Sequence, residues 1–219
     1  MSKYILFAYL FFYAVDSYTQ VQVRDEPRHH NVFENHVIRI LDVYLPPGDT
    51  SLYHLHNTPS VFIVLANANV GSQPLGGQPQ VGANLSGTIT YDKIATLRTH
   101  KVWNADTNWF HVMDIELTGK DQTEQPIIKN ESLQLLFNEK EVTAYKVELK
   151  KDGRLQIPSS GNGYLLVSLG DATIDYKKDN TTQHLFMKAG HYIWIEPKKS
   201  ASFSSNSQAA GEFILLQLK

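Results

Sequence analysis

The chain contains the stretch Leu52-Tyr53-His54-Leu55-His56-Asn57, in which two histidines stand two residues apart. On a β-strand that spacing places both imidazoles on one face, with Tyr53 and Leu55 on the other. Two imidazoles from one strand converge on a point suited to a metal ion and need a third ligand from a neighbouring strand. Hydrogen-bonded pocket histidines without a metal are the alternative interpretation.

His100 is the candidate for the third ligand. The run His100-Lys101-Val102-Trp103-Asn104 alternates, so that His100, Val102 and Asn104 share one strand face. Imidazole binds zinc, copper, iron and nickel. The pattern therefore predicts one divalent transition metal (Fe, Zn, Cu, Ni or Mn) held by His54, His56 and His100.

These residues resemble the two motifs of the cupin superfamily. Gly48, a spacer of five residues and His54-Leu55-His56 match its first motif, and His100 with Asn104 matches the end of its second. The glutamate of the first motif is missing, since Ser60 or Val61 stands there, and Ala95-Thr96-Leu97-Arg98-Thr99 replaces the Pro-x-Gly of the second. The resemblance thus implies a barrel whose metal site keeps three histidines and lacks the acidic ligand.

Short apolar or alternating runs recur along the chain and are separated by Gly, Pro, Asn and Asp, as in sandwiches and barrels. A faint repeat in layout suggests duplication, and with the resemblance it predicts an all-β chain of two tandem double-stranded β-helix (cupin, jelly-roll) barrels. The expected division is a signal peptide at 1–20, an N-terminal cupin at 21–118, a crossing segment at 119–140 and a degenerate cupin at 141–219. The expected strands are Val37–Tyr44, Ser51–His56, Val61–Ala66, Gly87–Tyr91, His100–Asn104, Phe110–Leu117, Thr143–Leu149, Gly163–Leu169, Ala172–Tyr176, Gln183–Lys188, Tyr192–Glu196 and Glu212–Leu218.

The second half lacks the metal chemistry. Gln156–Gly161 stands where a His-x-His pair would fall, and Ser202 or Phe203 stands near the position of the last histidine. His184 and His191 are isolated. A metal-free structural barrel is the interpretation for this half. Between the expected strands of the first half, Val70–Leu85 is rich in Gly, Gln and Pro and reads as a loop or lid.

Further polar residues are candidates for supporting roles. On Phe110–Leu117 the face with His111 also carries Met113, Ile115 and Leu117, so we expect that face to point inward and His111 to line the pocket as a proton carrier or outer partner. The other interpretation of His111 is a backbone-bonded residue at the barrel mouth. His29 and His30 are expected to be outer or surface groups, and Glu34 is the nearest carboxylate that could replace the missing glutamate.

The N-terminal residues indicate export. Lys3 precedes the apolar run 4–15, and polar and small residues follow, which is the layout of a secretory signal. We therefore expect a periplasmic or secreted protein with no stable membrane span after signal removal. A retained anchor is the alternative. The chain has no cysteine, which excludes disulfides and thiolate sites.

The expected partner is a small molecule, because three neutral imidazoles leave the full metal charge to attract an anionic ligand or a water. A net charge of −2 without a basic block argues against nucleic acid. A homodimer is also considered. The interpretation favoured slightly is a metal-binding cupin that holds a small molecule. The alternatives are a metal-dependent dioxygenase of a small organic acid or phenol, and a sugar isomerase or lyase.

Overall fold

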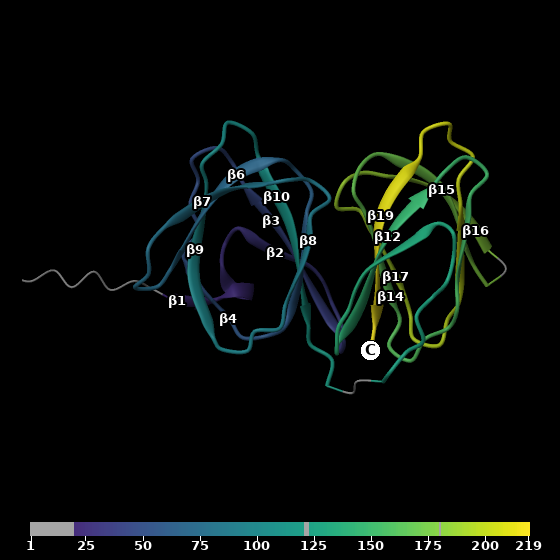
Figure 1. Cartoon of the computed structure of the whole chain (residues 1–219), viewed down its shortest axis with the longest axis horizontal. Helices are drawn as coiled ribbons and strands as arrows, with labels where there is room; N and C mark the ends of the chain where they lie inside the picture. The colour runs from purple at the N-terminus through teal and green to yellow at the C-terminus, as the bar shows by residue number, and fades with distance from the viewer. Residues whose placement is uncertain (1–19, 121–122, 180) are drawn as a thin grey trace, which may run out of the picture.

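The computed structural model describes residues 20–219 except 121, 122 and 180, and shows two β-barrels side by side (Figure 1). The signal peptide expected at 1–20 falls almost wholly outside the described residues. Each barrel consists of two facing sheets. The prediction of an all-β fold with two jelly-roll barrels is confirmed.

Ten strands and the short 3-10 helix η1 (Val23–Asp25) build the first barrel. One sheet has the order β1, β4, β9, β6, β7, with bounds Gln20–Gln22, Tyr53–His56, Arg98–Asn104, Ala68–Pro74 and Gln80–Asn84. The other has the order β2, β3, β10, β5, β8, with bounds His29–Glu34, Ile38–Leu45, Phe110–Leu117, Ser60–Val64 and Ile89–Asp92.

The second barrel repeats this strand order. One sheet runs β11, β12, β19, β14, β17, with bounds Leu133–Asn138, Val142–Leu149, Gly211–Leu218, Tyr164–Ser168 and Tyr192–Ile195. The other runs β13, β18, β15, β16, with bounds Arg154–Ile157, Ala201–Ser204, Ala172–Lys178 and Thr181–Met187. Adding nine to the number of each first-barrel strand from β2 on gives its counterpart. The faint repeat in the sequence is therefore a repeat of topology, to which the first barrel adds β1.

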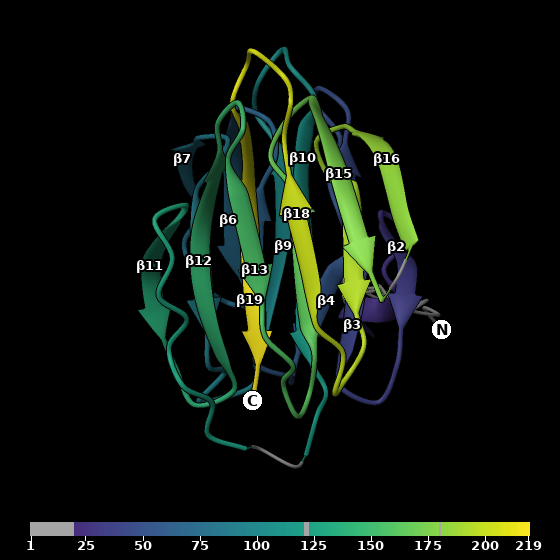
Figure 2. The ribbon, with the colours of Figure 1, turned by 90° about the vertical axis from the view of Figure 1, so that its right-hand side faces the viewer.

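The two barrels pack through one sheet of each. Met113, Ile115 and Leu117 of β10 belong to one apolar cluster with Ile214 and Leu216 of β19. Figure 1 shows these two strands in the facing sheets, and Figure 2 views the molecule from the side of the second barrel. Because this sheet of the first barrel is covered by the second barrel on one face and lines its own interior with the other, all eight residues of β10 are buried.

Aromatic and aliphatic side chains fill the interior of the second barrel. Tyr145, Tyr164, Phe203 and Phe213 are each at most 1% exposed and belong to one cluster with the aliphatic residues around them. Burial of such large side chains is the main stabilising contribution available to a chain without disulfides. The cluster occupies the space that corresponds to the cavity of the first barrel.

Two segments differ from the sequence prediction. Val70–Leu85, expected to be a loop or lid, forms most of the hairpin of β6 and β7. Strand β6 of this hairpin also pairs with β9. Gly71 is required there, since a Cβ at this position would lie 1.8 Å from the Trp103 ring. The segment 119–140, expected to be a crossing, contains the edge strand β11.

Candidate metal centre

Two adjacent strands position the three histidines. β4 and β9 are antiparallel neighbours in which His54 pairs with His100 and His56 with Arg98. The spacing of two residues keeps His54 and His56 on the inward face, as the sequence predicts. His54 and His56 are 1% and 2% exposed.

The three imidazoles form a compact triangle. Ring centroids are 4.7 Å apart for His54 and His100 and 5.0 Å apart for the other two pairs. Nε2 of His56 lies 3.1 Å from Nε2 of His100, and one potential ligand atom from each histidine lies within 4.8 Å of the others. The structure therefore brings together the three residues that the sequence singles out, in a group that could hold a metal ion.

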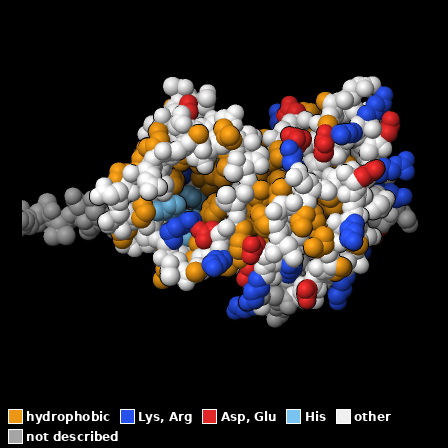
Figure 3. All heavy atoms as spheres, viewed as in Figure 1, with side chains coloured by type: hydrophobic (Ala, Val, Ile, Leu, Met, Phe, Trp, Pro, Cys, Tyr) orange, Lys and Arg blue, Asp and Glu red, His pale blue; other side chains and the backbone are white. Residues whose placement is uncertain are grey.

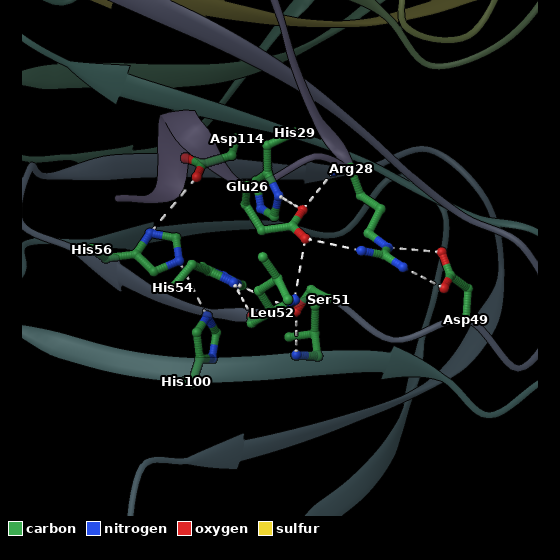
Figure 4. A network of polar contacts seen from close by, with 11 residues as sticks. Glu26, Arg28, His29, Asp49, Ser51, Leu52, His54, His56, His100 and Asp114 are labelled. Atoms are coloured by element: carbon green, nitrogen blue, oxygen red, sulfur yellow. Dashed lines mark hydrogen bonds and ion pairs between the residues drawn. The ribbon is translucent and has the colours of Figure 1, made fainter. Parts of the chain in front are cut away.

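Two of the imidazoles have a hydrogen-bonded outer partner, and the third faces a carboxyl group. Nδ1–H of His54 donates to the Leu52 carbonyl at 3.0 Å, and Nδ1 of His100 lies 3.1 Å from Ser72 Oγ. Nδ1 of His56 faces Asp114 Oδ2 at 3.7 Å (Figure 4). Partners on Nδ1 leave Nε2 as the inward ligand atom, and such outer contacts fix the tautomer of metal-binding histidines.

Burial keeps these imidazoles neutral. It lowers the pKa of His54 to about 4 and that of His100 to about 3. Repulsion between two rings that were both protonated, His54 with His29 and His100 with His54, lowers the two pKa values further. The pKa of His56 is lowered further by the same causes. Neutral imidazoles offer nitrogen lone pairs at neutral pH, which is the form that a metal ion binds. The donor set thus fits a divalent ion of borderline softness.

Asp114 of β10 is the buried carboxyl of the site. Its side chain is 1% exposed, and neither carboxyl oxygen has a hydrogen-bond partner among the described residues. Burial, with a smaller contribution from the nearby charge of Glu116, raises its pKa to about 8. In the metal-free protein Asp114 therefore adds no negative charge beside His56 at neutral pH.

A second polar pair lies beside His54. Nδ1 of His29 lies 2.8 Å from Oε2 of Glu26, and the His29 ring centroid is 4.7 Å from that of His54 (Figure 4). Although burial alone would raise the pKa of Glu26, hydrogen bonds from His29 and from the backbone N–H groups of Arg28 and Leu52 lower it to about 2. Glu26 therefore carries a negative charge that fixes the orientation of His29.

The triad opens into a cavity of about 270 Å³ within the first barrel. In Figure 3 histidine side chains are visible at the bottom of a hollow in that barrel. Most of the lining away from the histidines is apolar, with Arg98 and Asp114 as its charged or ionisable groups. The lining is formed by His29, Val43, His54, His56, Phe62, Val64, Val70, Ser72, Asn84, Thr88, Thr90, Arg98, His100, Val102, Phe110, Val112 and Asp114.

His111 lies outside this cavity. It is on the opposite face of β10, where Nε2 contacts Asp42 Oδ1 at 2.7 Å and the ring stacks on Tyr44. A Cβ on Gly190 of the second barrel would lie 3.0 Å from the His111 ring. The prediction that the His111 face of β10 points into the pocket is therefore wrong. That more apolar face packs against the other barrel, and the face with Asp114 lines the cavity.

The other supporting candidates also differ from expectation. Glu34 is half exposed and forms an ion pair with Arg39, so it does not replace the missing glutamate of the motif. His30 is exposed, whereas His29 lines the cavity. The sequence does not show which of these two histidines turns inward, because adjacent strand residues point to opposite faces.

In the second barrel the corresponding positions are apolar. The pairs Leu155 with Phe203 and Ile157 with Ala201 take the places of His54 with His100 and of His56 with Arg98. By the same strand alignment Leu215 takes the place of Asp114. Those comparisons are the signal that could have identified Asp114 and Arg98, because each is a polar residue where the repeat has an apolar one.

Comparison with solved structures shows which proteins share the fold of this chain. The chain superposes on the protein AerE from Microcystis aeruginosa with a TM-score of 0.60 and 9% identity, over 89% of this chain and 98% of that one. A cupin 2 conserved barrel domain protein from Leptotrichia buccalis gives a TM-score of 0.57 with 9% identity, over 87% and 88% of the two chains. The fold is that of the cupin superfamily.

A third structural match is salicylate 1,2-dioxygenase from Pseudaminobacter salicylatoxidans, with a TM-score of 0.60 and 9% identity over 82% of this chain and 70% of the enzyme. At such identities the likeness extends to the cupin fold alone. No protein-family profile and no curated protein sequence matches the chain. Among the described residues, no helix has the length and apolar character needed to cross a membrane.

Proposed function

We propose that this two-barrel cupin binds one divalent transition metal through Nε2 of His54, His56 and His100, and a small molecule at the remaining metal positions. The observation that carries the proposal is the convergence of three neutral imidazoles, two buried and one (His100) partly buried, whose Nδ1 atoms face outer groups. A closed zinc site of the structural kind would have a fourth protein ligand. Three protein ligands and an adjoining cavity instead support a site that takes a ligand from solution.

The charges of the site indicate the kind of ligand. When bound, a divalent metal supplies a Lewis acid and lowers the pKa of a bound water or acid. The three imidazoles are neutral at neutral pH and therefore cancel none of the charge of the ion. The full positive charge of the ion would therefore remain to attract an anion. The apolar walls exclude water and strengthen that attraction.

Elemental analysis of the purified full chain tests metal binding. We expect about one equivalent of a divalent transition metal per chain, and its loss in the double variant His54→Ala, His56→Ala. His184→Ala is the matched control, because His184 is an exposed histidine of the second barrel. Full metal content in the double variant would show that the ion binds elsewhere, and a wild-type chain that binds none after incubation with Zn²⁺ or Fe²⁺ would refute the proposal.

The second candidate function is a dioxygenase acting on a small organic acid or phenol. The apolar lining around a metal centre with free positions favours it, and salicylate 1,2-dioxygenase shares the fold. Oxygen uptake by the Fe²⁺-loaded chain across a panel of aromatic acids and phenols tests this function. Uptake that is lost in the His54→Ala, His56→Ala variant would support it, and absence of uptake with every compound would favour binding without turnover.

Export is a further part of the proposal. It rests on the sequence pattern of Lys3 and the apolar run 4–15. Expression of the full chain with N-terminal sequencing of the exported fraction tests it. We expect a mature chain that begins near residue 20, whereas an uncleaved chain in the cytosol would contradict export.

A further inference from the structure

Arg98 is the cationic residue of the cavity, and β9 holds it beside two of the three histidines. It lies two residues before His100 on the same strand face and directly opposite His56 on β4. Residues at these positions are strand neighbours whose side chains point the same way. Arg98 therefore lines the cavity next to the candidate metal centre.

The guanidinium group of Arg98 is held in place but is only partly satisfied. Nη1 donates to Asp92 Oδ2 at 2.6 Å, and the guanidinium carbon lies 5.8 Å from the centroid of the Phe62 ring. Nε is buried and has no hydrogen-bond partner among the described residues. Nε and Nη2 share one edge of the guanidinium plane. The contact with Asp92 at Nη1 thus leaves Nη2, at the end of a side chain that is 39% exposed, to donate to a carboxylate. Buried Nε can add the second parallel hydrogen bond once the side chain shifts to open that edge.

A buried donor without a partner has a cost unless a ligand satisfies it. An unpaired N–H in an apolar site loses its water without replacing it, which is why buried polar groups are nearly always bonded. The cavity beside Arg98 has apolar walls that include Phe62, Val64 and Val112. Its volume of about 270 Å³ lies just below the range typical of sites for drug-sized molecules.

We propose that Arg98 anchors the carboxylate of a small monocarboxylic acid whose apolar body lies against Phe62 and the valine walls. This inference deepens the proposed function, because it assigns a ligand class to the same cavity. The planar fork of arginine selects a planar carboxylate, and the apolar walls disfavour sugars and other polyols. Asp92 fixes the orientation of the Arg98 guanidinium group. The carboxylate of the acid then points toward Arg98, and its other substituents can reach the metal positions.

Calorimetric titration of the full chain with benzoate and with its neutral isostere benzamide tests the anchor. The titrations use both metal-free and Zn²⁺-loaded protein, and elemental analysis accompanies each variant. We expect benzoate to bind at least 10-fold more tightly than benzamide, and Arg98→Met to weaken benzoate binding by about 10- to 100-fold without changing benzamide binding. Arg98→Lys keeps the charge but not the fork and should still lose most of that preference.

Lys101→Met is the matched control. It removes one positive charge three residues along β9, on the outward face, where the Lys101 ammonium lies 5.3 Å from the Tyr53 ring centroid. We expect benzoate affinity to change less than 2-fold in this variant. A loss equal to that of Arg98→Met would show that general charge attraction is responsible and would overturn the anchor.

Further outcomes separate the anchor from the metal site. Wild-type protein that binds Zn²⁺ but not benzoate overturns the anchor and leaves the metal proposal intact. The same holds for Zn²⁺-binding protein that binds benzoate and benzamide equally well. Arg98-dependent benzoate binding by a chain that takes up no Zn²⁺ on incubation supports the anchor while the metal proposal fails. Phosphate binding tighter than benzoate binding would overturn the assignment of a carboxylic acid. Thermal unfolding shows whether each variant is folded before titration.

Discussion

Replacement of Asp114 by Asn should stabilise the metal-free protein at neutral pH. The carboxyl group of Asp114 is buried without a hydrogen-bond partner, and its pKa is raised to about 8. In the unfolded chain the same group ionises near the ordinary pKa of an aspartate, 3.8. Between these two values the folded state holds a proton that the unfolded state has released, so stability falls as pH rises.

The size of the effect follows from the shift. Each pH unit in this window costs about 1.4 kcal/mol, so that about 4 kcal/mol is lost between pH 4 and pH 7. An amide at position 114 does not titrate and avoids this loss, but an unpaired buried amide costs about 1–3 kcal/mol. We therefore expect Asp114→Asn to raise the free energy of unfolding by about 1–3 kcal/mol at pH 7 and to lower it at pH 4.

Urea denaturation of metal-free wild type and variant at pH 4, 5, 6, 7 and 8 measures the difference. Glu116→Gln is the matched control, because Glu116 lies two residues along the same strand, is also buried and pairs with Arg39 at 2.6 Å. This control should lose about 1–3 kcal/mol, since it removes the ion-pair partner of Arg39. A difference between wild type and Asp114→Asn that does not change with pH would refute the reasoning.

Two further predictions follow from close contacts. Gly71→Ala should lower the melting temperature by several degrees, because the new Cβ would lie 1.8 Å from the Trp103 ring. Gly82→Ala is the control and should change the melting temperature little, because a Cβ there has free space. Equal melting temperatures for the two variants would contradict the packing argument. Ser72→Ala removes the outer partner of His100 and should weaken Zn²⁺ affinity by about 10-fold in a competition titration with a chelator, and an unchanged affinity would show that Ser72 does not orient His100.

The sequence predicts the histidine triad because its signal is local. His54 and His56 share a face through strand geometry alone, and His100 stands in a second alternating run that the cupin motif associates with the first. The lack of a His-x-His pair at Gln156–Gly161 and of a histidine near Ser202 or Phe203 likewise predicts a second barrel without the metal motif. These inferences need only the period of a strand and the spacing of a motif. The strand register shows that Leu155 and Ile157 hold the matching positions.

The rest of the site depends on packing between distant segments. Asp114 reaches His56 only because β10 turns its polar-looking face inward, and the second barrel covers the face with His111. An eight-residue strand buried on both faces has no alternation that would reveal this. His29 lines the cavity beside His54 of a distant strand, with ring centroids 4.7 Å apart, while the local contact with Glu26 fixes its orientation.

An anomalous difference map from a crystal of the metal-loaded full chain tests the central claim most directly. The proposed function predicts a single strong peak in the first barrel, about 2.0–2.2 Å from Nε2 of His54, His56 and His100, with non-protein ligands at the remaining positions. The second barrel should show no peak between Leu155 and Phe203. A peak bound by fewer than two of the three histidines, or one located outside the first barrel, would contradict the proposed metal centre.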